Sequence, residues 1–340
     1  MFGERYQAKS QAAICLLAAI GSTAACVPDS PLRCGELTRE QLQALPSQLS
    51  ETGLYTDVEA DTLADGVTPF EPGFELWSDG AVKRRWLWLP PGTQIDTSNL
   101  DDWRFPRGTK VWKEFVRDGA RIETRLIQKI GDGDEQEDWV NMAYLWRRDG
   151  ADADAVVEGV IDAHGTPHNV PAAIECQGCH GGRKSWLLGV SAVQLAQDAA
   201  PGMLDLDELR SRGWLSAPPS QPIAIPGNEI ERAALGYLHA NCGSCHNSNR
   251  PPREEQRCLD PEVSLDVWLQ TEALETPQTT NTYRTMSPWV RAGNPDASEL
   301  IARVKSRSVG FGSKGMPILG TEQVDHDAVV LLEQWIAEMK

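Results

Sequence analysis

Two short strings of the form C-x-x-C-H constrain this chain of 340 residues more than any other feature. The first, "CQGCH", occupies residues 176–180, and the second, "CGSCH", occupies residues 242–246. The chain has only 8 cysteines and 6 histidines, so chance predicts far fewer than one such string. The fold must therefore present two Cys-Cys-His groups of identical spacing.

This spacing is the signature of covalent heme c attachment. Two thiols separated by two residues on a helical turn match the porphyrin vinyl groups, and the following histidine supplies an axial imidazole to the iron. We expect two covalently attached hemes c. The first, heme 1, would be held by Cys176, Cys179 and His180, and the second, heme 2, by Cys242, Cys245 and His246.

A zinc site and a thiol redox pair explain the two strings less well. The two C-x-x-C pairs of a four-cysteine zinc site usually lie about 15 to 20 residues apart. Here 62 residues separate Cys179 from Cys242. A thioredoxin-like pair is expected near a βαβ pattern, which the sequence lacks.

The N-terminus predicts export. Arg5 and Lys9 precede a short apolar run, "AAICLLAAIGSTA", which is too short to be a permanent membrane span. The run ends in "TAAC", so we expect residues 1–25 to be a signal peptide, cleaved before Cys26 or simply near Ala25. No other stretch is long and apolar enough to be a transmembrane helix. Export agrees with heme c, which is attached outside the cytoplasm.

Charge and the remaining cysteines bound the partners. A net charge of −17 and a pI of about 4.8 exclude the clustered basic surface that nucleic acids require. An acidic surface can steer a basic redox partner, or it can simply keep the protein soluble. Cys15 lies in the signal peptide and Cys26 at its cleavage site, so Cys34 and Cys258 remain. In an exported protein they either form a disulfide or stay as buried thiols.

The chain is predicted to be an α+β protein built in sequence order. Residues 26–70 are expected to form a tether with one short helix, and residues 71–165 an antiparallel β-sandwich-like domain. The alternation in "RIETRLIQKI" and the turn dipeptide Asp118-Gly119 indicate strands and a hairpin. Residues 166–224 are expected to be a linker-like first heme segment, and residues 225–340 a helical cytochrome region whose first helix is capped by Asn228.

Residues 225–340 resemble a class I cytochrome c domain. That family packs a helix bearing a Gly-aromatic pair across a C-terminal helix with a large aromatic residue, and here Gly236-Tyr237 and Trp335 match those positions. The resemblance implies a methionine sixth ligand in the loop before the last helix, which is Met316 in "KGMPILG". Met286 is the rival ligand, but it lacks that loop-then-helix context.

Two further resemblances concern the N-terminus and most of the remaining chain. "TAAC" resembles the lipobox of bacterial lipoproteins, except that Thr23 stands where leucine is usual. It implies lipidation of Cys26, and Val27 favours the outer membrane. Residues 50–340 resemble a family of exported bacterial diheme c-type cytochromes, with "FELWSDGAVKRRW", "WRFPRGTKVWKEF", "IETRLI" and "YLHANCGSCHN" as matching stretches. This family implies no particular reaction.

The sixth ligand of heme 1 decides between two functions. His168, Met203 and His239 are the candidates, and a vacant position is the fourth possibility. With both hemes closed, the protein is expected to be a periplasmic or outer-membrane electron carrier serving an exported redox partner. With heme 1 open, it is expected to be a heme oxidoreductase, such as a peroxidase or a small-nitrogen enzyme. Glu123, Arg125 or His168 would then line the distal pocket.

Overall fold

The computed structural model describes residues 41, 43–250, 264–307 and 315–340. The predictions for the signal peptide, the lipobox and the Cys34–Cys258 pair fall outside these residues. In the described ranges no helix is both long and apolar enough to cross a bilayer. The chain combines helices with antiparallel sheets, as expected of an α+β protein.

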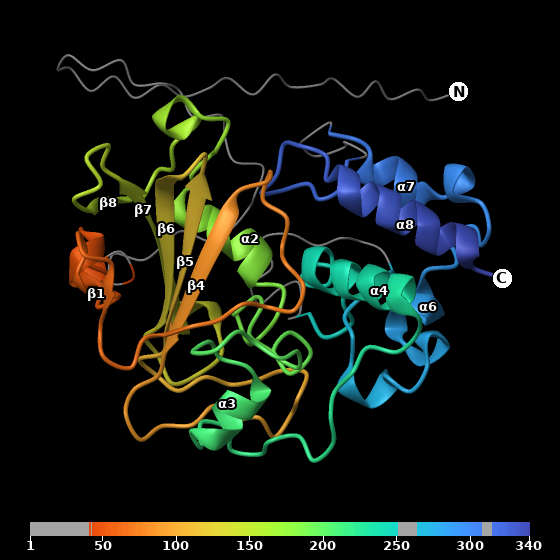
Figure 1. Ribbon diagram of the computed structural model, residues 1–340, viewed down its shortest axis with the longest axis horizontal. Helices are drawn as coiled ribbons and strands as arrows, with labels where there is room; N and C mark the ends of the chain where they lie inside the picture. The colour runs from red at the N-terminus through yellow and green to blue at the C-terminus, as the bar shows by residue number, and fades with distance from the viewer. Residues whose placement is uncertain (1–40, 42, 251–263, 308–314) are drawn as a thin grey trace, which may run out of the picture.

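The largest element is a six-stranded antiparallel meander (Figure 1). Its strands follow one another in sequence order: β3 (Thr68–Pro69), β4 (Val82–Trp88), β5 (Lys110–Arg117), β6 (Ala120–Lys129), β7 (Trp139–Trp146) and β8 (Ala153–Val156). The predicted hairpin between β5 and β6 is confirmed. Asp118 and Gly119 both have positive φ, 49° and 79°, as a tight turn between twisted strands requires.

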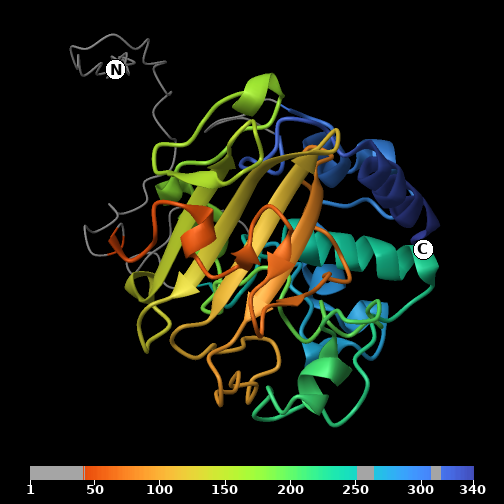
Figure 2. The same ribbon diagram turned by 60° about the vertical axis from the view of Figure 1, so that its left-hand side comes forward.

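The prediction of two sheets packed as a sandwich is wrong, because the structure has only one large sheet. The second sheet is only a two-stranded ribbon, β1 (Tyr55–Asp57) with β2 (Thr62–Leu63). This ribbon covers what we call the outer face of the meander (Figure 2). There the outward-facing tryptophans of β4, β5 and β7 pack with Leu49, Leu54 and Tyr55 in one buried cluster. The ribbon and the residues just before it therefore cover the face that a second sheet was expected to cover.

The opposite face of the meander, the inner face, is covered by the segment expected to be a linker. Leu87, Val111 and Ile127 from three adjacent strands share one buried cluster with Trp186 and Leu187. The same cluster continues to Leu215, beyond the short helix α3 (Leu206–Ser211). Residues 186–215 are thus an integral part of the sheet's core and not a linker.

The C-terminal region is a group of helices: α4 (Glu229–Asn241), α6 (Asn281–Thr285), α7 (Glu299–Val304) and α8 (His326–Glu338). The carboxamide of Asn228 accepts the Glu231 N–H at 2.9 Å, which confirms the predicted cap of α4. Helices α4 and α8 pack together through Leu238, Leu332 and Trp335. Gly236, also on α4, leaves room for the Phe74 ring, which is far away in the sequence. A Cβ at this position would overlap that ring.

Residues 73–79 join the sheet to these helices. The Trp77 N–H donates to the Asn241 carboxamide oxygen at 2.7 Å, and the Asn241 amide returns a 2.9 Å bond to the Glu75 carbonyl. The Asp79 carboxylate accepts the N–H groups of Glu322 and Gln323, just before α8. The remaining one-turn 3-10 helices are Leu49–Glu51, Gln136–Asp138, Ala163–Gly165, Ala173–Glu175, Thr271–Ala273, Pro277–Thr279 and Pro295–Ala297.

Candidate functional site

The first C-x-x-C-H string forms a helical turn of its own, α2 (Cys176–His180), directly after the 3-10 turn Ala173–Glu175. Cys176 and Cys179 are three residues apart in this helix, so their side chains lie on one face. His180 ends the helix. The turn lies between the inner face of the sheet and helix α4 (Figure 1).

The imidazole of His180 is oriented by a main-chain acceptor. Its Nδ1 lies 2.6 Å from the Trp186 carbonyl oxygen. A carbonyl only accepts, so Nδ1 carries the proton and Nε2 keeps a lone pair. Burial lowers the pKa of His180 to about 4, so the ring is neutral near pH 7. A neutral imidazole with its Nδ1–H held by a carbonyl is the arrangement of a metal ligand.

The second string forms a tight turn at the end of α4. The N–H of Cys242 still bonds to Leu238 O, and the N–H of His246 bonds to Cys242 O at 2.8 Å. His246 is also neutral near pH 7, because burial lowers its pKa to about 4. Its Nδ1 is buried without a hydrogen-bond partner among the described residues, so this ring lacks the anchor that His180 has.

The four thiols are not arranged as a metal-thiolate site. Burial raises the pKa of Cys176, Cys242 and Cys245 to about 12, and it also raises the pKa of Cys179. The thiols are therefore protonated near pH 7 in the metal-free chain. Across the part of the chain that the structure describes, no three His, Cys, Asp or Glu side chains are grouped to hold a metal ion.

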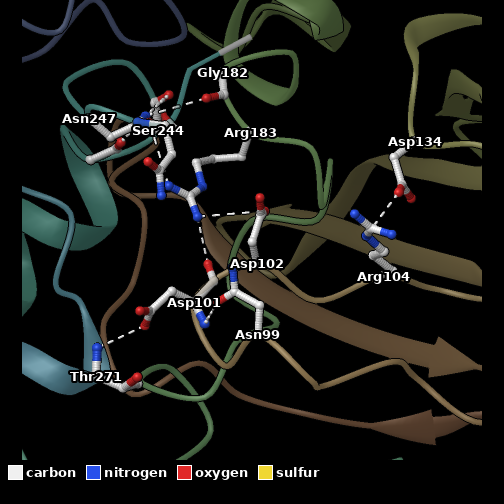
Figure 3. A network of polar contacts seen from close by, with 12 residues as sticks. Asn99, Asp101, Asp102, Arg104, Asp134, Gly182, Arg183, Ser244, Asn247 and Thr271 are labelled. Carbon is white, nitrogen blue, oxygen red and sulfur yellow. Dashed lines mark hydrogen bonds and ion pairs between the residues drawn. The ribbon is translucent and has the colours of Figure 1, made fainter.

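The chain around the first string contacts the chain around the second at Gly182, Ser244 and Asn247. The Asn247 side-chain amide donates to the carbonyl of Gly182 at 3.3 Å and to that of Ser244 at 3.0 Å (Figure 3). The main chains approach so closely that a Cβ at Gly182 would overlap the Ser244 carbonyl oxygen. Gly182 lies two residues after the first motif and Ser244 lies within the second, so 61 intervening residues return the chain to the first motif.

A buried guanidinium secures this junction. Arg183 is 1 % exposed; its Nη2 donates to the Asp101 carbonyl at 2.6 Å and lies 3.5 Å from the Asp102 carboxylate (Figure 3). The guanidinium also stacks over the Trp268 ring at 4.1 Å. The Asp101 carboxylate accepts the Thr271 N–H at 2.8 Å. The loop after β4 is thereby tied to the first motif and to the chain that follows the second.

Three polar residues named from the sequence come together on the inner face. His168 Nε2 lies 2.7 Å from the Glu123 carboxylate, which also accepts Arg125 Nε at 2.9 Å. Burial would raise the pKa of Glu123, but the charge of Arg125 and the bond from His168 hold it below its usual value. Arg125 lies close enough to the first motif to lower the pKa of the Cys176 thiol against the opposing effect of burial.

The three candidate sixth ligands of the first motif lie in different surroundings. Nε2 of His168 is committed to Glu123. His239 Nδ1 accepts the Leu269 N–H at 3.1 Å, so its proton is on Nε2, which is then not a free lone pair. Met203 lies in the turn before α3, where its N–H bonds to Ala200 O and the following Leu204 pairs with Pro69.

The two methionines proposed for the second motif are in different environments. Met286 packs against the cluster formed by α4 and α8, as a core side chain does. Met316 is half-buried in the stretch before α8, and its N–H donates to Arg303 O at 3.0 Å. Arg303 is also one of the charges that lower the pKa of His246 after burial. Arg303 is thus a neighbour of both Met316 and His246.

Comparison of the chain with protein-family models, with curated proteins and with solved structures finds no match in any of the three. The functional argument therefore depends on the residues of this chain.

The sequence interpretation did not single out Gly182, Arg183, Asp102 or Lys113. The first two had a usable signal, because "GGRKS" follows the first string immediately. Asp102 and Lys113 had none, since only folding brings residues more than 60 positions away in the chain to the first motif.

The junction makes a testable prediction for Gly182→Ala. The new methyl group would overlap main-chain atoms of Ser244, so one motif must move. We expect a loss of at least about 2 kcal/mol in the free energy of unfolding, measured by denaturant titration. Gly181→Ala is the control, because the φ of −71° at Gly181 suits alanine. Equal stability of the two variants would contradict the close approach.

Proposed function

We propose that the chain is an exported diheme c-type cytochrome that transfers electrons. Heme 1 would be attached to Cys176 and Cys179 and heme 2 to Cys242 and Cys245. The observation that carries the proposal is the first motif itself. It forms one helical turn whose histidine donates Nδ1–H to a carbonyl and keeps Nε2 available. The contact between the two motifs at Gly182 and Ser244 supports a shared electron-transfer role.

When bound, the two hemes would supply reversible one-electron chemistry. The chain's own residues would orient the histidine ligands and hold the two motifs together. His180, oriented by the Trp186 carbonyl, would supply its imidazole to the heme iron, while Arg183 and Asn247 keep the two motifs in register. The rings of Trp268 and His239, 4.2 Å apart, fill the space beside the second motif and exclude water there.

The finer architecture belongs to the same proposal. We infer that residues 225–340 form a class I-like cytochrome region with Met316 as the sixth ligand of heme 2. The packing of α4 on α8 through Trp335 and the position of Met316 before α8 support this inference. Thioether ligation favours electron transfer because it closes the iron and raises its potential.

The location and partner are part of the proposal too. A signal peptide over residues 1–25, with lipidation of Cys26, would anchor the protein in the outer membrane facing the periplasm. A net charge of −17 would steer a basic exported redox partner towards it.

Covalent attachment is the direct test. The chain is expressed with heme-maturation machinery, and the denatured protein is weighed. We expect the mass of two hemes on the wild type and of one heme on either double variant, Cys176→Ala/Cys179→Ala or Cys242→Ala/Cys245→Ala. A wild-type protein with the mass of its bare polypeptide would refute the proposal.

Met316→Ala should open heme 2. We expect one heme to become high-spin, to bind carbon monoxide when reduced, and to fall in midpoint potential, because the thioether ligand is lost. Met286→Ala is the matched control. It should cost about 2–5 kcal/mol of stability as a core truncation but leave both hemes low-spin. The opposite pattern would move the ligand assignment to Met286.

A second function is favoured by one observation, the Glu123–His168–Arg125 group beside the first motif. These residues suit proton transfer and charge stabilisation at an open iron, so a heme oxidoreductase is the alternative. If heme 1 is open, the reduced wild-type protein should bind carbon monoxide at one heme. His168→Ala should change that heme's spectrum, while Met316→Ala should add a second gas-binding heme. Absence of binding in the wild type would eliminate this alternative.

A further inference from the structure

Three cations stand in one row across the inner face of the sheet. In the strand register, Arg85 of β4 lies opposite Lys113 of β5, and Lys113 lies opposite Arg125 of β6. Residues directly opposite each other across neighbouring strands point to the same face, so the three side chains are adjacent. Like charges in this position destabilise a sheet. The row therefore needs nearby negative charge.

The carboxylates present compensate only the two ends of the row. Glu75 accepts both terminal nitrogens of Arg85 at 3.1 Å, and Glu123 accepts Arg125 at 2.9 Å. Lys83 draws on Glu75 as well, at 3.5 Å. Three cations thus share two carboxylates, Arg85 and Lys83 on Glu75 and Arg125 on Glu123.

The central residue of the row has no counter-charge in direct contact. Lys113 is half-buried and has neither a hydrogen bond nor an ion pair with any described residue; its ammonium lies 4.9 Å from the centre of the Phe115 ring. Burial lowers the pKa of Lys113 well below its usual value, and the charges of Arg85, Arg125 and Lys83 lower it further. An anion beside the ammonium would oppose both effects.

The row faces the first motif. Helix α2, which carries the first motif, lies between this face of the sheet and helix α4 (Figure 1). The next row along the strands, from Leu87 to Ile127, packs on Trp186, whose carbonyl holds His180. The whole chain carries a net charge of −17, so this group of cations differs in sign from the protein's overall charge.

We propose that Arg85, Lys113 and Arg125 form an anion site at the first motif, with Lys113 contacting a carboxylate or another small oxyanion. The setting rests on the proposed attachment of heme at Cys176 and Cys179. The anion has two possible sources of the same chemistry. It is either a side-chain carboxylate of the heme bound there or a free oxyanion such as nitrite or formate. Lysine serves as a point charge for either one.

The test uses the mature holoprotein and three variants. Lys113→Gln removes the charge at similar size, and Lys113→Arg keeps it. Lys184→Gln removes an exposed cation four residues after His180 and controls for net charge near α2. Sodium formate and sodium nitrite are titrated against sodium chloride at equal ionic strength. The melting temperature and the midpoint potential of heme 1 are recorded in each case.

Two results support the site and identify the source. If formate or nitrite raises the melting temperature and shifts the potential of the wild type and of Lys113→Arg, and about tenfold more anion is needed in Lys113→Gln, the site takes a free anion. If added anions have no effect but Lys113→Gln lowers the potential of heme 1 more than Lys184→Gln does, the site holds the heme's own carboxylate. A lost cation favours the oxidised iron, hence the lower potential.

One result overturns the proposal: no anion dependence, together with the same potential in Lys113→Gln and Lys184→Gln. Failure of heme attachment is a separate outcome, visible as the mass of the bare polypeptide. In that case the melting temperatures still decide, because a free-anion site stabilises the wild type and Lys113→Arg but not Lys113→Gln. Equal melting behaviour of the three would then reject the site.

Discussion

The buried Arg183 guanidinium is the interaction on which the arrangement of the two motifs depends. It joins Asp101 and Asp102 of the β region to Asn247 of the second motif, and it belongs to the first motif itself. Breaking a buried ion pair by removing one partner costs about 3–5 kcal/mol, because an uncompensated charge remains. Few other side chains could hold the close approach of Gly182 to Ser244, since a guanidinium donates in several directions from one plane.

The inner face of the sheet uses charge where a soluble meander would use apolar side chains. Glu123 has no exposed surface, and Arg85 is 5 % exposed, yet both lie on strands in the middle of the fold. Both charges are compensated, Glu123 by Arg125 and Arg85 by Glu75. The apolar row beside them shows that burial alone did not require this chemistry. The polar row coincides with the side facing His180.

Local features were predictable from the sequence, and long-range coverage was not. The turn at Asp118 and Gly119 and the Asn228 cap follow from neighbouring residues, and both are confirmed. The alternation of β6 showed that its two faces differ, but it did not show what covers each face. The sandwich was therefore expected where a ribbon and residues 186–215 cover the sheet instead.

The candidate site divides in the same way. The six C-x-x-C-H residues were evident because their spacing alone specifies the chemistry. The grouping of Glu123, Arg125 and His168 was suggested from residue type, and the structure brings them into contact. Lys113 and Asp102 escaped notice because their role depends on strand register and loop packing, which one sequence does not encode in any short pattern.

The Asp79 carboxylate, which receives the main-chain N–H groups of Glu322 and Gln323, has a consequence for how the protein can be divided. It lies near the start of the sheet but restrains the peptide that follows Met316. The helical region excised at residue 225 would lose this restraint, together with the Phe74 ring seated on Gly236. The two halves are thus not interchangeable cassettes, and a transplanted helical half would need a substitute for the sheet that it left behind.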